Sequence, residues 1–226
     1  RLSQTGEKIS DRYGQVGNRK NPLSIFSGYM MEIAPAKPEN IAKIAALHRA
    51  VLRHTTNSRL GAWFLEKLYK TLIENNDRGN VYVAQEGEEI FGFISFGYDY
   101  KTTKKILKKN ISKKDALRIL SSLLKQPWLI KKLLTERWFG NFLAKQPSPF
   151  PIILTLGVSP DQQGKGIAKQ LMDCAVGEMA KRGYAKIFLD TEKRNIRAQK
   201  FYEKFGFQKY GEKYGNALFV YENHVE

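Results

Sequence analysis

The sequence predicts one α/β domain that is interrupted by a basic helical insertion. Short apolar runs typical of strands alternate with segments whose apolar residues recur at helical spacing. Two of these runs, 81–84 and 90–96, are separated only by a short charged turn, a pattern typical of an antiparallel hairpin. A third run, 152–158, leads through a glycine-rich turn into a long helical pattern. The 226 residues suffice for one large domain, or for a compact domain with appendages.

The first third of the chain predicts a tail, a strand and two helices before the hairpin. Residues 1–29 are rich in glycine and polar residues without a sustained period, so we predict a flexible tail there and a domain over 30–226. Pro35 ends the first strand, and Pro38 opens the first helix with an acid in its first turn. The predicted elements are strand 31–34, helices 38–51 and 60–73, and the hairpin.

A strongly basic insertion is predicted over 100–149. Between 101 and 145 the sequence has 13 Lys or Arg and 2 Asp or Glu, so this segment carries 13 − 2 = +11 of the net charge of +16. Two short helices, 113–125 and 128–138, are predicted on either side of a proline. Their apolar stripes and lysine-rich faces fit four roles: a solvated face over a satellite core, a contact with a membrane surface, a lid, or a grip on an anionic acceptor.

The last third of the chain predicts alternating helices and strands. The helix after the glycine-rich turn begins near Gln163 and ends at Arg182 and Gly183, with cations in its last turn. Asn195 begins the last helix. The predicted elements are strand 152–158, helix 163–181, strand 185–189, helix 195–205 and strand 217–221.

The composition excludes several classes of protein. The longest apolar stretch, 150–158, is too short to cross a bilayer, and the N-terminal region does not resemble a signal peptide. The single cysteine, Cys174, excludes an internal disulfide framework. The three scattered histidines and this cysteine lack metal-ligand spacing, so no metal site is predicted. A reducing, cytoplasmic location is the expectation that follows.

Residues 163–168 are the strongest chemical motif, because they follow a strand and open a helix. The unpaired N–H groups and positive dipole end of a helix suit a pyrophosphate at such a position. Gly164 and Gly166 let the backbone approach the phosphates. Lys165 adds charge, and the small Ala168 keeps the helix close to the ligand. The sequence lacks the Gly-Lys-Ser/Thr of a P-loop and departs from the dinucleotide fingerprint, which leaves an ordinary strand-turn-helix as the alternative.

A second motif lies on the last predicted helix. Asn195 can cap this helix with its side chain. Tyr202 lies two turns further along the same face, where its phenol could meet a ligand laid across the sheet edge. Packing in the core is the alternative role for this tyrosine.

Together, the two motifs and the order of elements resemble the GNAT superfamily of N-acetyltransferases over about 31–221, without the insertion. The superfamily signature Gln/Arg-x-x-Gly-x-Gly/Ala is matched by Gln163, Gly166 and Ala168. The resemblance implies a twisted, mixed and mostly antiparallel sheet flanked by helices, acetyl-CoA as co-substrate, and Tyr202 as the donor of a proton to the leaving thiolate. It also implies that acetyl-CoA is held by strand groups, turn amides and one asparagine: Leu156, Gly157, Val158, Gln163, Gly164, Lys165, Gly166, Ile167, Ala168 and Asn195.

The resemblance further implies that an amine attacks the thioester directly, so Cys174 is expected to pack rather than react. Two residues are candidates for the base that deprotonates the amine: Glu192, just past a strand end, and His54. The polar segment with His54, Thr55 and Thr56 borders the acceptor cleft of this fold and suits an amino sugar. A solvated loop with a helix cap is the alternative there. A looser resemblance to GNAT proteins of bacterial surface-glycan synthesis points to the same class of acceptor.

Three functions remain as hypotheses. The first is an N-acetyltransferase for a small-molecule amine such as an amino sugar or a sugar nucleotide. The second is an N-acetyltransferase for a protein or peptide amine. The third is a membrane- or nucleic-acid-binding module that uses the insertion, although a nucleic acid is disfavoured because aromatic residues at base-stacking spacing are missing there. An anionic membrane surface bound through 101–145, at the inner face of the membrane, and a homodimer both stay open.

Overall fold

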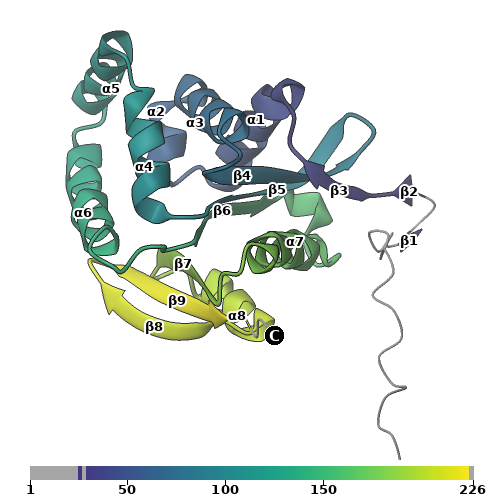
Figure 1. Ribbon diagram of the computed structural model, residues 1–226. Coiled ribbons are helices and arrows are strands. Elements are labelled where there is room, and N and C mark those ends of the chain that lie inside the picture. The colour runs from purple at the N-terminus through teal and green to yellow at the C-terminus, as the bar shows by residue number, and fades with distance from the viewer. Residues whose placement is uncertain (1–24, 27–28, 224–226) are drawn as a thin grey trace, which may run out of the picture.

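The computed structural model describes residues 25–26 and 29–223 and is built on one seven-stranded sheet (Figure 1). The strand order is β3-β4-β5-β6-β7-β9-β8, and β6 and β7 are its one parallel pair. The predicted α/β class with a mixed, mostly antiparallel sheet is confirmed. The strands of this sheet are β3 (Glu32–Pro35), β4 (Gly79–Glu86), β5 (Glu89–Gly97), β6 (Ile152–Val158), β7 (Lys186–Glu192), β8 (Gln208–Lys213) and β9 (Asn216–Glu222).

Two short strands precede this sheet. β1 (Ile25–Phe26) and β2 (Tyr29–Met30) pair with each other and not with the seven other strands. The remaining residues of the predicted tail, 1–24 and 27–28, lie outside the described part of the chain, so the prediction of a flexible tail is not tested there.

Helices cover both faces of the sheet (Figure 1). Helices α1, α3 and α6 pack on one face, and α7 and α8 pack on the other. Among the residues described, no helix is both long and apolar enough to cross a membrane. The helices are α1 (Ile41–Val51), α2 (Thr56–Leu60), α3 (Ala62–Glu74), α4 (Tyr100–Lys109), α5 (Lys113–Lys125), α6 (Trp128–Leu143), α7 (Ile167–Lys181) and α8 (Ile196–Phe205).

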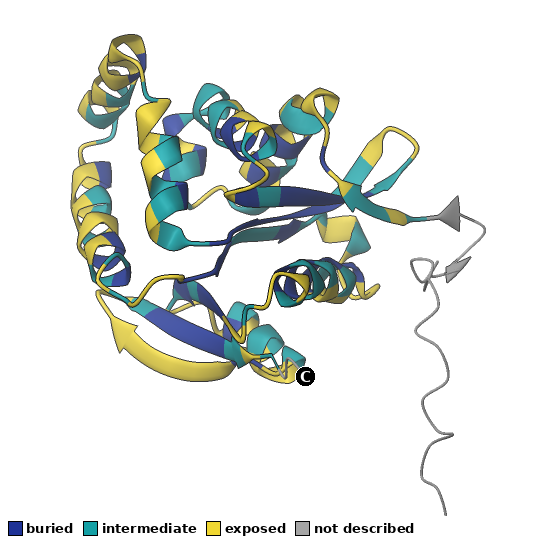
Figure 2. Ribbon diagram, viewed as in Figure 1, coloured by how far each residue is buried: buried dark blue, intermediate teal, exposed yellow. Residues whose placement is uncertain are grey.

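Alternation along the strands divides the core between the two faces of the sheet. On β7, Ile187 and Leu189 pack with α7 and α8, whereas Phe188 packs with α6. The ring of Phe150 stacks on that of Phe188 with 4.0 Å between the centroids. Figure 2 shows buried inner surfaces on these helices and an exposed outer strand β8. Helix α6 of the insertion therefore covers a sheet face of the main core, rather than closing a satellite core of its own.

Several elements differ from the prediction, among them three helices and one exposed strand. The helix predicted over 60–73 is divided into α2 and α3 at Gly61, whose φ of +109° favours glycine and breaks the helix. Helix α4 was not predicted, and Asp99 caps it by accepting a hydrogen bond from the N–H of Thr102. Helix α6 continues beyond 138 to Leu143. Strand β8 was also missed, because every residue of it is exposed and only its pairing with β9 defines it.

Asp99 joins the two ends of the insertion. Its Oδ1 accepts hydrogen bonds from Ser148 Oγ at 2.9 Å and from the N–H of Phe150 at 3.1 Å. Burial alone would raise the pKa of Asp99, but hydrogen bonds, those from Thr102 among them, outweigh burial and lower it. One ionised carboxylate thus holds the chain before α4 against the chain before β6.

A buried polar network links α1 to α3. His48 Nδ1 lies 2.5 Å from Tyr69 Oη, and His48 Nε2 lies 3.3 Å from Thr55 Oγ1. The imidazole also stacks on Phe93 of β5, with 5.7 Å between the ring centroids. Both His48 and Tyr69 are buried. Burial lowers the pKa of His48 from 6.5 to about 4, so the ring is neutral near pH 7.

We expect His48 to make the free energy of unfolding depend on pH. Between 6.5 and about 4 the unfolded chain binds a proton at His48 and the folded chain does not, so stability present above this range is lost as the pH falls. Lowering the pH from about 7.5 to about 5 is expected to cost about 2 kcal/mol through this group. Urea denaturation at the two pH values measures the loss.

The matched control is His48→Gln, which removes the titrating ring and keeps a polar side chain. This variant is expected to be less stable at both pH values, because its contacts with Tyr69 and Phe93 change. Its loss of stability between the two pH values should be smaller by about 2 kcal/mol. Equal losses in the two proteins would contradict the assignment to His48.

Candidate active site

The parallel strands β6 and β7 separate near the middle of the sheet. They are paired only at Ile152 with Phe188 and at Ile153 with Leu189. Beyond these pairs, β6 stays hydrogen-bonded to β5 and β7 stays hydrogen-bonded to β9. The separation begins where the pairing of β6 with β5 skips Leu154, a β-bulge that bends a strand away from its neighbour. The result is an opening in the sheet, bordered by the ends of β6 and β7.

Leu156, Gly157 and Val158 lie on β6 along this opening. Gly157 is buried, and a Cβ added there would lie 2.6 Å from Cε1 of Phe93 and 2.9 Å from Cγ2 of Val51, so a larger residue does not fit without a shift. The three residues follow the last residue of β6 that pairs with β7, so their β7-facing backbone groups border the opening. Binding of a pantetheine arm there remains a prediction.

The glycine-rich turn lies exposed at the head of α7. A 3-10 turn, Pro160–Gln162, comes first, and α7 itself begins at Ile167 rather than at the predicted Gln163. Gly164 and Gly166 have φ of +85° and +83°, which favours glycine. Apart from the adjoining residues of the turn, no described atom lies within 4 Å of a Cβ placed on either glycine, so the space beside the turn is open. The N-cap Gly166 gives α7 no side-chain cap, which leaves first-turn N–H groups to an anion.

The side chain of Gln163 connects this turn to strand β6 and to helix α8. Its Nε2 donates to the carbonyl oxygen of Val158 at 3.3 Å, and its Oε1 accepts from Arg197 Nη2 at 2.7 Å. Arg197 is exposed on α8 and was not identified from the sequence. Its guanidinium lies beside the turn, where it can bind a phosphate. Lys165, which was predicted to add charge here, donates to Gln162 Oε1 at 2.9 Å.

Asn195 and Tyr202 lie on α8 as predicted. Asn195 is the N-cap, and its Oδ1 accepts from the N–H of Ala198 at 3.2 Å, so the side-chain NH₂ is the group left for a ligand. The ring of Tyr202 packs 6.0 Å from that of Phe219. Burial, and then the charge of Asp190, raise the pKa of Tyr202, so the phenol keeps its proton at neutral pH. A residue that donates a proton must hold one, and Tyr202 does.

Asp190 is the functional candidate that sequence reasoning missed. It follows Leu189, the last residue of β7 that pairs with β6, and it is partly exposed. Burial, and then the negative charge of Glu136, raise the pKa of Asp190 to about 7. Asp190 in turn raises the pKa of Tyr202. A carboxyl group that titrates near neutral pH, and whose charge acts on a protonated phenol, fits a general base.

Glu192, the base candidate from the sequence, is held by two cations. Its Oε1 lies 3.0 Å from Lys132 Nζ, and its Oε2 accepts from Arg194 Nε at 2.6 Å. Burial alone would raise the pKa of Glu192, but the hydrogen bonds from Arg194 and Lys132 outweigh burial and lower it. A carboxylate with a lowered pKa and two cationic partners is a weaker base than Asp190, so the geometry favours Asp190 over Glu192.

Helix α6 of the insertion forms one wall of the site. Lys132 also donates to the carbonyl oxygen of His54 at 2.6 Å, and Glu136 Oε1 accepts from Thr56 Oγ1 at 2.5 Å. Thr55 is the N-cap of α2. The predicted acceptor segment therefore lies against α6, with Thr55 and Thr56 already hydrogen-bonded within the chain. Contact of His54, Thr55 and Thr56 with an acceptor remains a prediction.

Cys174 lies on α7 and packs against the main core. Burial, and then neighbouring charges such as Glu178, raise the pKa of its thiol to about 12. A thiol with this pKa is not a nucleophile at neutral pH, which agrees with the packing role expected from the sequence.

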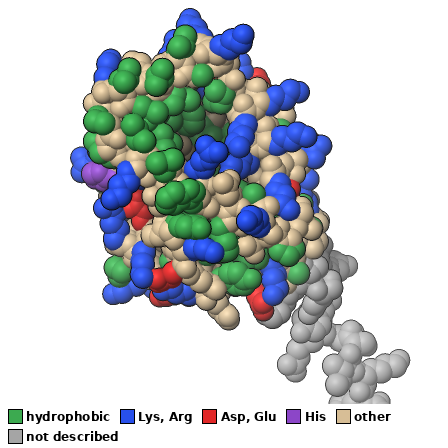
Figure 3. All heavy atoms as spheres, turned by 90° about the vertical axis from the view of Figure 1, so that its left-hand side faces the viewer, with side chains coloured by type: hydrophobic (Ala, Val, Ile, Leu, Met, Phe, Trp, Pro, Cys, Tyr) green, Lys and Arg blue, Asp and Glu red, His purple; other side chains and the backbone are tan. Residues whose placement is uncertain are grey.

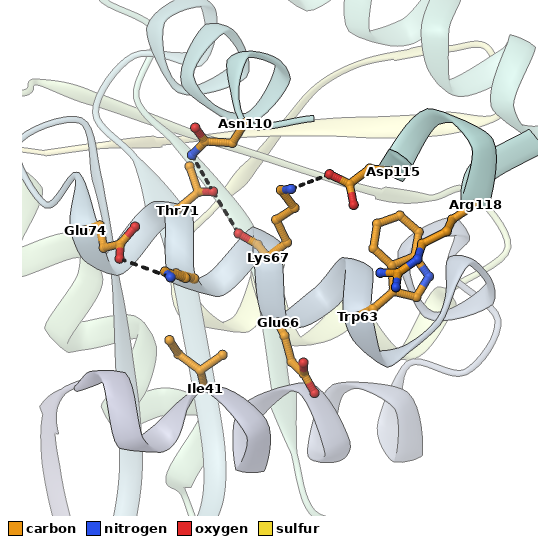
Figure 4. A pocket seen from close by; sticks show the side chains of 10 residues that line it. Ile41, Trp63, Glu66, Lys67, Thr71, Glu74, Asn110, Asp115 and Arg118 are labelled. Atoms are coloured by element: carbon orange, nitrogen blue, oxygen red, sulfur yellow. Dashed lines mark hydrogen bonds and ion pairs between the residues drawn. The ribbon is translucent and has the colours of Figure 1, made fainter. Parts of the chain in front are cut away.

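A separate cavity of about 630 Å³ lies between α1, α3 and α5 (Figure 4). Four of its six charged side chains form two ion pairs, and a fifth lies over an aromatic ring. Lys67 binds Asp115 of α5, Lys70 lies 3.7 Å from Glu74, and Arg118 lies over the ring of Trp63. These contacts fasten the insertion to α3, and none of the predicted site residues lines this cavity.

Comparison with known proteins assigns the chain to a family. The model of the acetyltransferase (GNAT) family matches residues 48–207, which include both motifs and the insertion. Among curated proteins, N-alpha-acetyltransferase 30 of Schizosaccharomyces pombe is 37% identical over 80 residues, which are 33% of this chain and 53% of that protein. The match thus spans about half the length of the curated relative.

Solved structures share the fold at low sequence identity. The PaiA N-acetyltransferase from Thermoplasma acidophilum, in complex with coenzyme A, is 15% identical with a TM-score of 0.57, covering 85% of this chain and 99% of that chain. A SpeG spermidine N-acetyltransferase mutant from Vibrio cholerae is also 15% identical, with a TM-score of 0.54 and coverage of 87% and 98%. At these identities the likeness concerns the fold alone.

Proposed function

Because the chain belongs to the acetyltransferase (GNAT) family, we propose that it transfers the acetyl group of acetyl-CoA to a primary amine. One observation carries the proposal. The exposed glycine-rich turn at the head of α7 follows β6, whose end separates from β7 and borders the opening in the sheet. The open space beside Gly164 and Gly166 fits a pyrophosphate, since no described side chain fills it.

The proposed roles follow from what each group can do. Acetyl-CoA supplies an activated acyl carbon: the amine nitrogen bonds to that carbon, and the carbon–sulfur bond breaks. Asp190 accepts the proton that the ammonium must lose. Tyr202 donates a hydrogen bond and a proton to the departing sulfur. Backbone N–H groups of β6 near Gly157 polarise the carbonyl, as the family resemblance implies.

As the domain organisation, we propose a tail up to residue 29 and a transferase domain over 30–226 that includes the insertion 100–149. The contacts of α6 support treating the insertion as part of the domain, because Lys132 and Glu136 bind Glu192 and Thr56 of the candidate site.

For the acceptor we propose a small amine, such as an amino sugar or a sugar nucleotide. The support is that Glu136 of α6 binds Thr56 and also raises the pKa of Asp190, so this helix borders both the acceptor segment and the candidate base. A peptide amine is the second candidate, favoured by the partial match to an N-alpha-acetyltransferase.

A screen with labelled acetyl-CoA tests the proposed function and separates these acceptors. Amino sugars, amine-bearing sugar nucleotides, polyamines and peptides with free N-termini are offered in parallel, and amide products are counted. We expect acetyl transfer to an amino sugar or a sugar nucleotide. Transfer to peptides alone would support the second candidate. An absence of transfer to every amine, with acetyl-CoA bound, would contradict the proposed activity.

A further inference from the structure

The outer surface of the insertion carries large hydrophobic side chains in two stripes. Seven of the ten large hydrophobic residues exposed in the described chain lie on α5 and α6. On α5 the stripe has spacings of three and four residues, and on α6 it has spacings of four. The stripes are Leu117, Leu120 and Leu124, followed by Ile130, Leu134 and Trp138. Figure 3 shows hydrophobic side chains gathered around a hollow on this face, with Lys and Arg nearby.

The insertion as a whole is strongly positive. Segment 101–145 has thirteen cations and two acids. Both acids are turned to the body of the domain, since Asp115 binds Lys67 of α3 and Glu136 accepts from Thr56 of α2. Outward-facing charge on the insertion is therefore positive.

We propose that the outer face of α5 and α6 docks on an anionic lipid bilayer. A surface of this kind buries leucine and tryptophan side chains at its boundary while its phosphates attract lysines. A second copy of the chain fits poorly, because a symmetric contact would place two segments of charge +11 against each other. A nucleic acid would leave the aliphatic side chains exposed to water.

Docking would also set the position of the candidate active site relative to the bilayer. The opposite face of α6 carries Lys132 and Glu136, which bind Glu192, His54 and Thr56. One helix thus has its outer face on the bilayer and its inner face in the wall of the site. The docking proposal itself does not depend on acetyl transfer.

Vesicle sedimentation with the full chain tests the proposal. The probes are vesicles of phosphatidylcholine alone and vesicles with about a third phosphatidylglycerol. We expect sedimentation with the anionic vesicles, weakened by high salt. A triple variant, Leu117→Gln with Leu120→Gln and Leu124→Gln, should bind at least about tenfold more weakly, because three exposed leucines lose their burial in the boundary.

The matched control compares single changes of exposed hydrophobic residues. Leu124→Gln on α5 should weaken sedimentation, and Tyr210→Gln on the exposed strand β8 should leave it unchanged. Circular dichroism and thermal melting check that each variant folds. Four results would overturn the proposal: no sedimentation with anionic vesicles, undiminished binding by the triple variant, self-association that the triple variant abolishes, or RNA binding that it abolishes without any vesicle binding.

Discussion

Replacement of Asp190 by asparagine is expected to lower kcat by about 10²- to 10⁴-fold, the range for loss of a general base. Asparagine keeps the shape of the side chain but does not accept a proton from an ammonium group. In the unsubstituted protein the rate should rise with pH and level off above about 7, because only the ionised carboxylate accepts the proton and burial raises its pKa to about 7. Steady-state rates measured against pH for both proteins check the result.

The discriminating control for this prediction is Glu192→Gln. Glu192 is bound to Lys132 and Arg194, so its replacement is expected to cost less than about tenfold in kcat and to leave the inflection near pH 7 in place. A larger loss in Glu192→Gln than in Asp190→Asn would assign the base to Glu192. An unchanged pH profile in Asp190→Asn would equally contradict the role of Asp190.

Gly166→Glu is expected to weaken coenzyme A binding by at least about a hundredfold. The glycine has φ of +83°, and a side chain added to it would enter the open space beside the turn, where the pyrophosphate is proposed to lie. A carboxylate there would both fill the space and repel the phosphates, a repulsion of several kcal/mol at close range. Calorimetric titration with coenzyme A measures the change in Kd.

Gly183→Glu provides the control for backbone strain and added charge. Gly183 has φ of +78° and open space around its Cβ position, and it lies beyond the opposite end of α7. The helix of 15 residues separates the two glycines by about 22 Å. Coenzyme A affinity should survive in Gly183→Glu. Equal losses in the two variants would assign the effect to strain, and undiminished binding by Gly166→Glu would remove the turn from the binding site.

The fold was predictable where the spacing of apolar residues is regular. Apolar runs placed β4, β5 and β6 within a few residues, and the glycine-rich turn placed α7. Strand β8 was not predictable, because its side chains are all exposed and its pairing with β9 comes from the hairpin rather than from burial. Helix α4 was missed because its many lysines leave few apolar residues to show a helical period. Asp99 and Thr102 nevertheless form a helix-capping signal in the sequence.

The candidate site was predictable where it depends on short local motifs. Gln163, Gly166, Asn195 and Tyr202 could be named because the turn and the helix cap lie in continuous sequence. Asp190 had one signal that was overlooked: it is a charged residue directly after the apolar run that ends at Leu189. Its raised pKa depends first on burial and then on Glu136, which is distant in sequence, and single-sequence reasoning supplies neither.

A crystal structure of the chain with coenzyme A tests the central claim most directly. The account predicts phosphates against the N–H groups of residues 164–168, and the sulfur in the opening between β6 and β7, next to Tyr202 and Asp190. Coenzyme A bound on another surface, such as the cavity between α1, α3 and α5, with the opening empty, would contradict it.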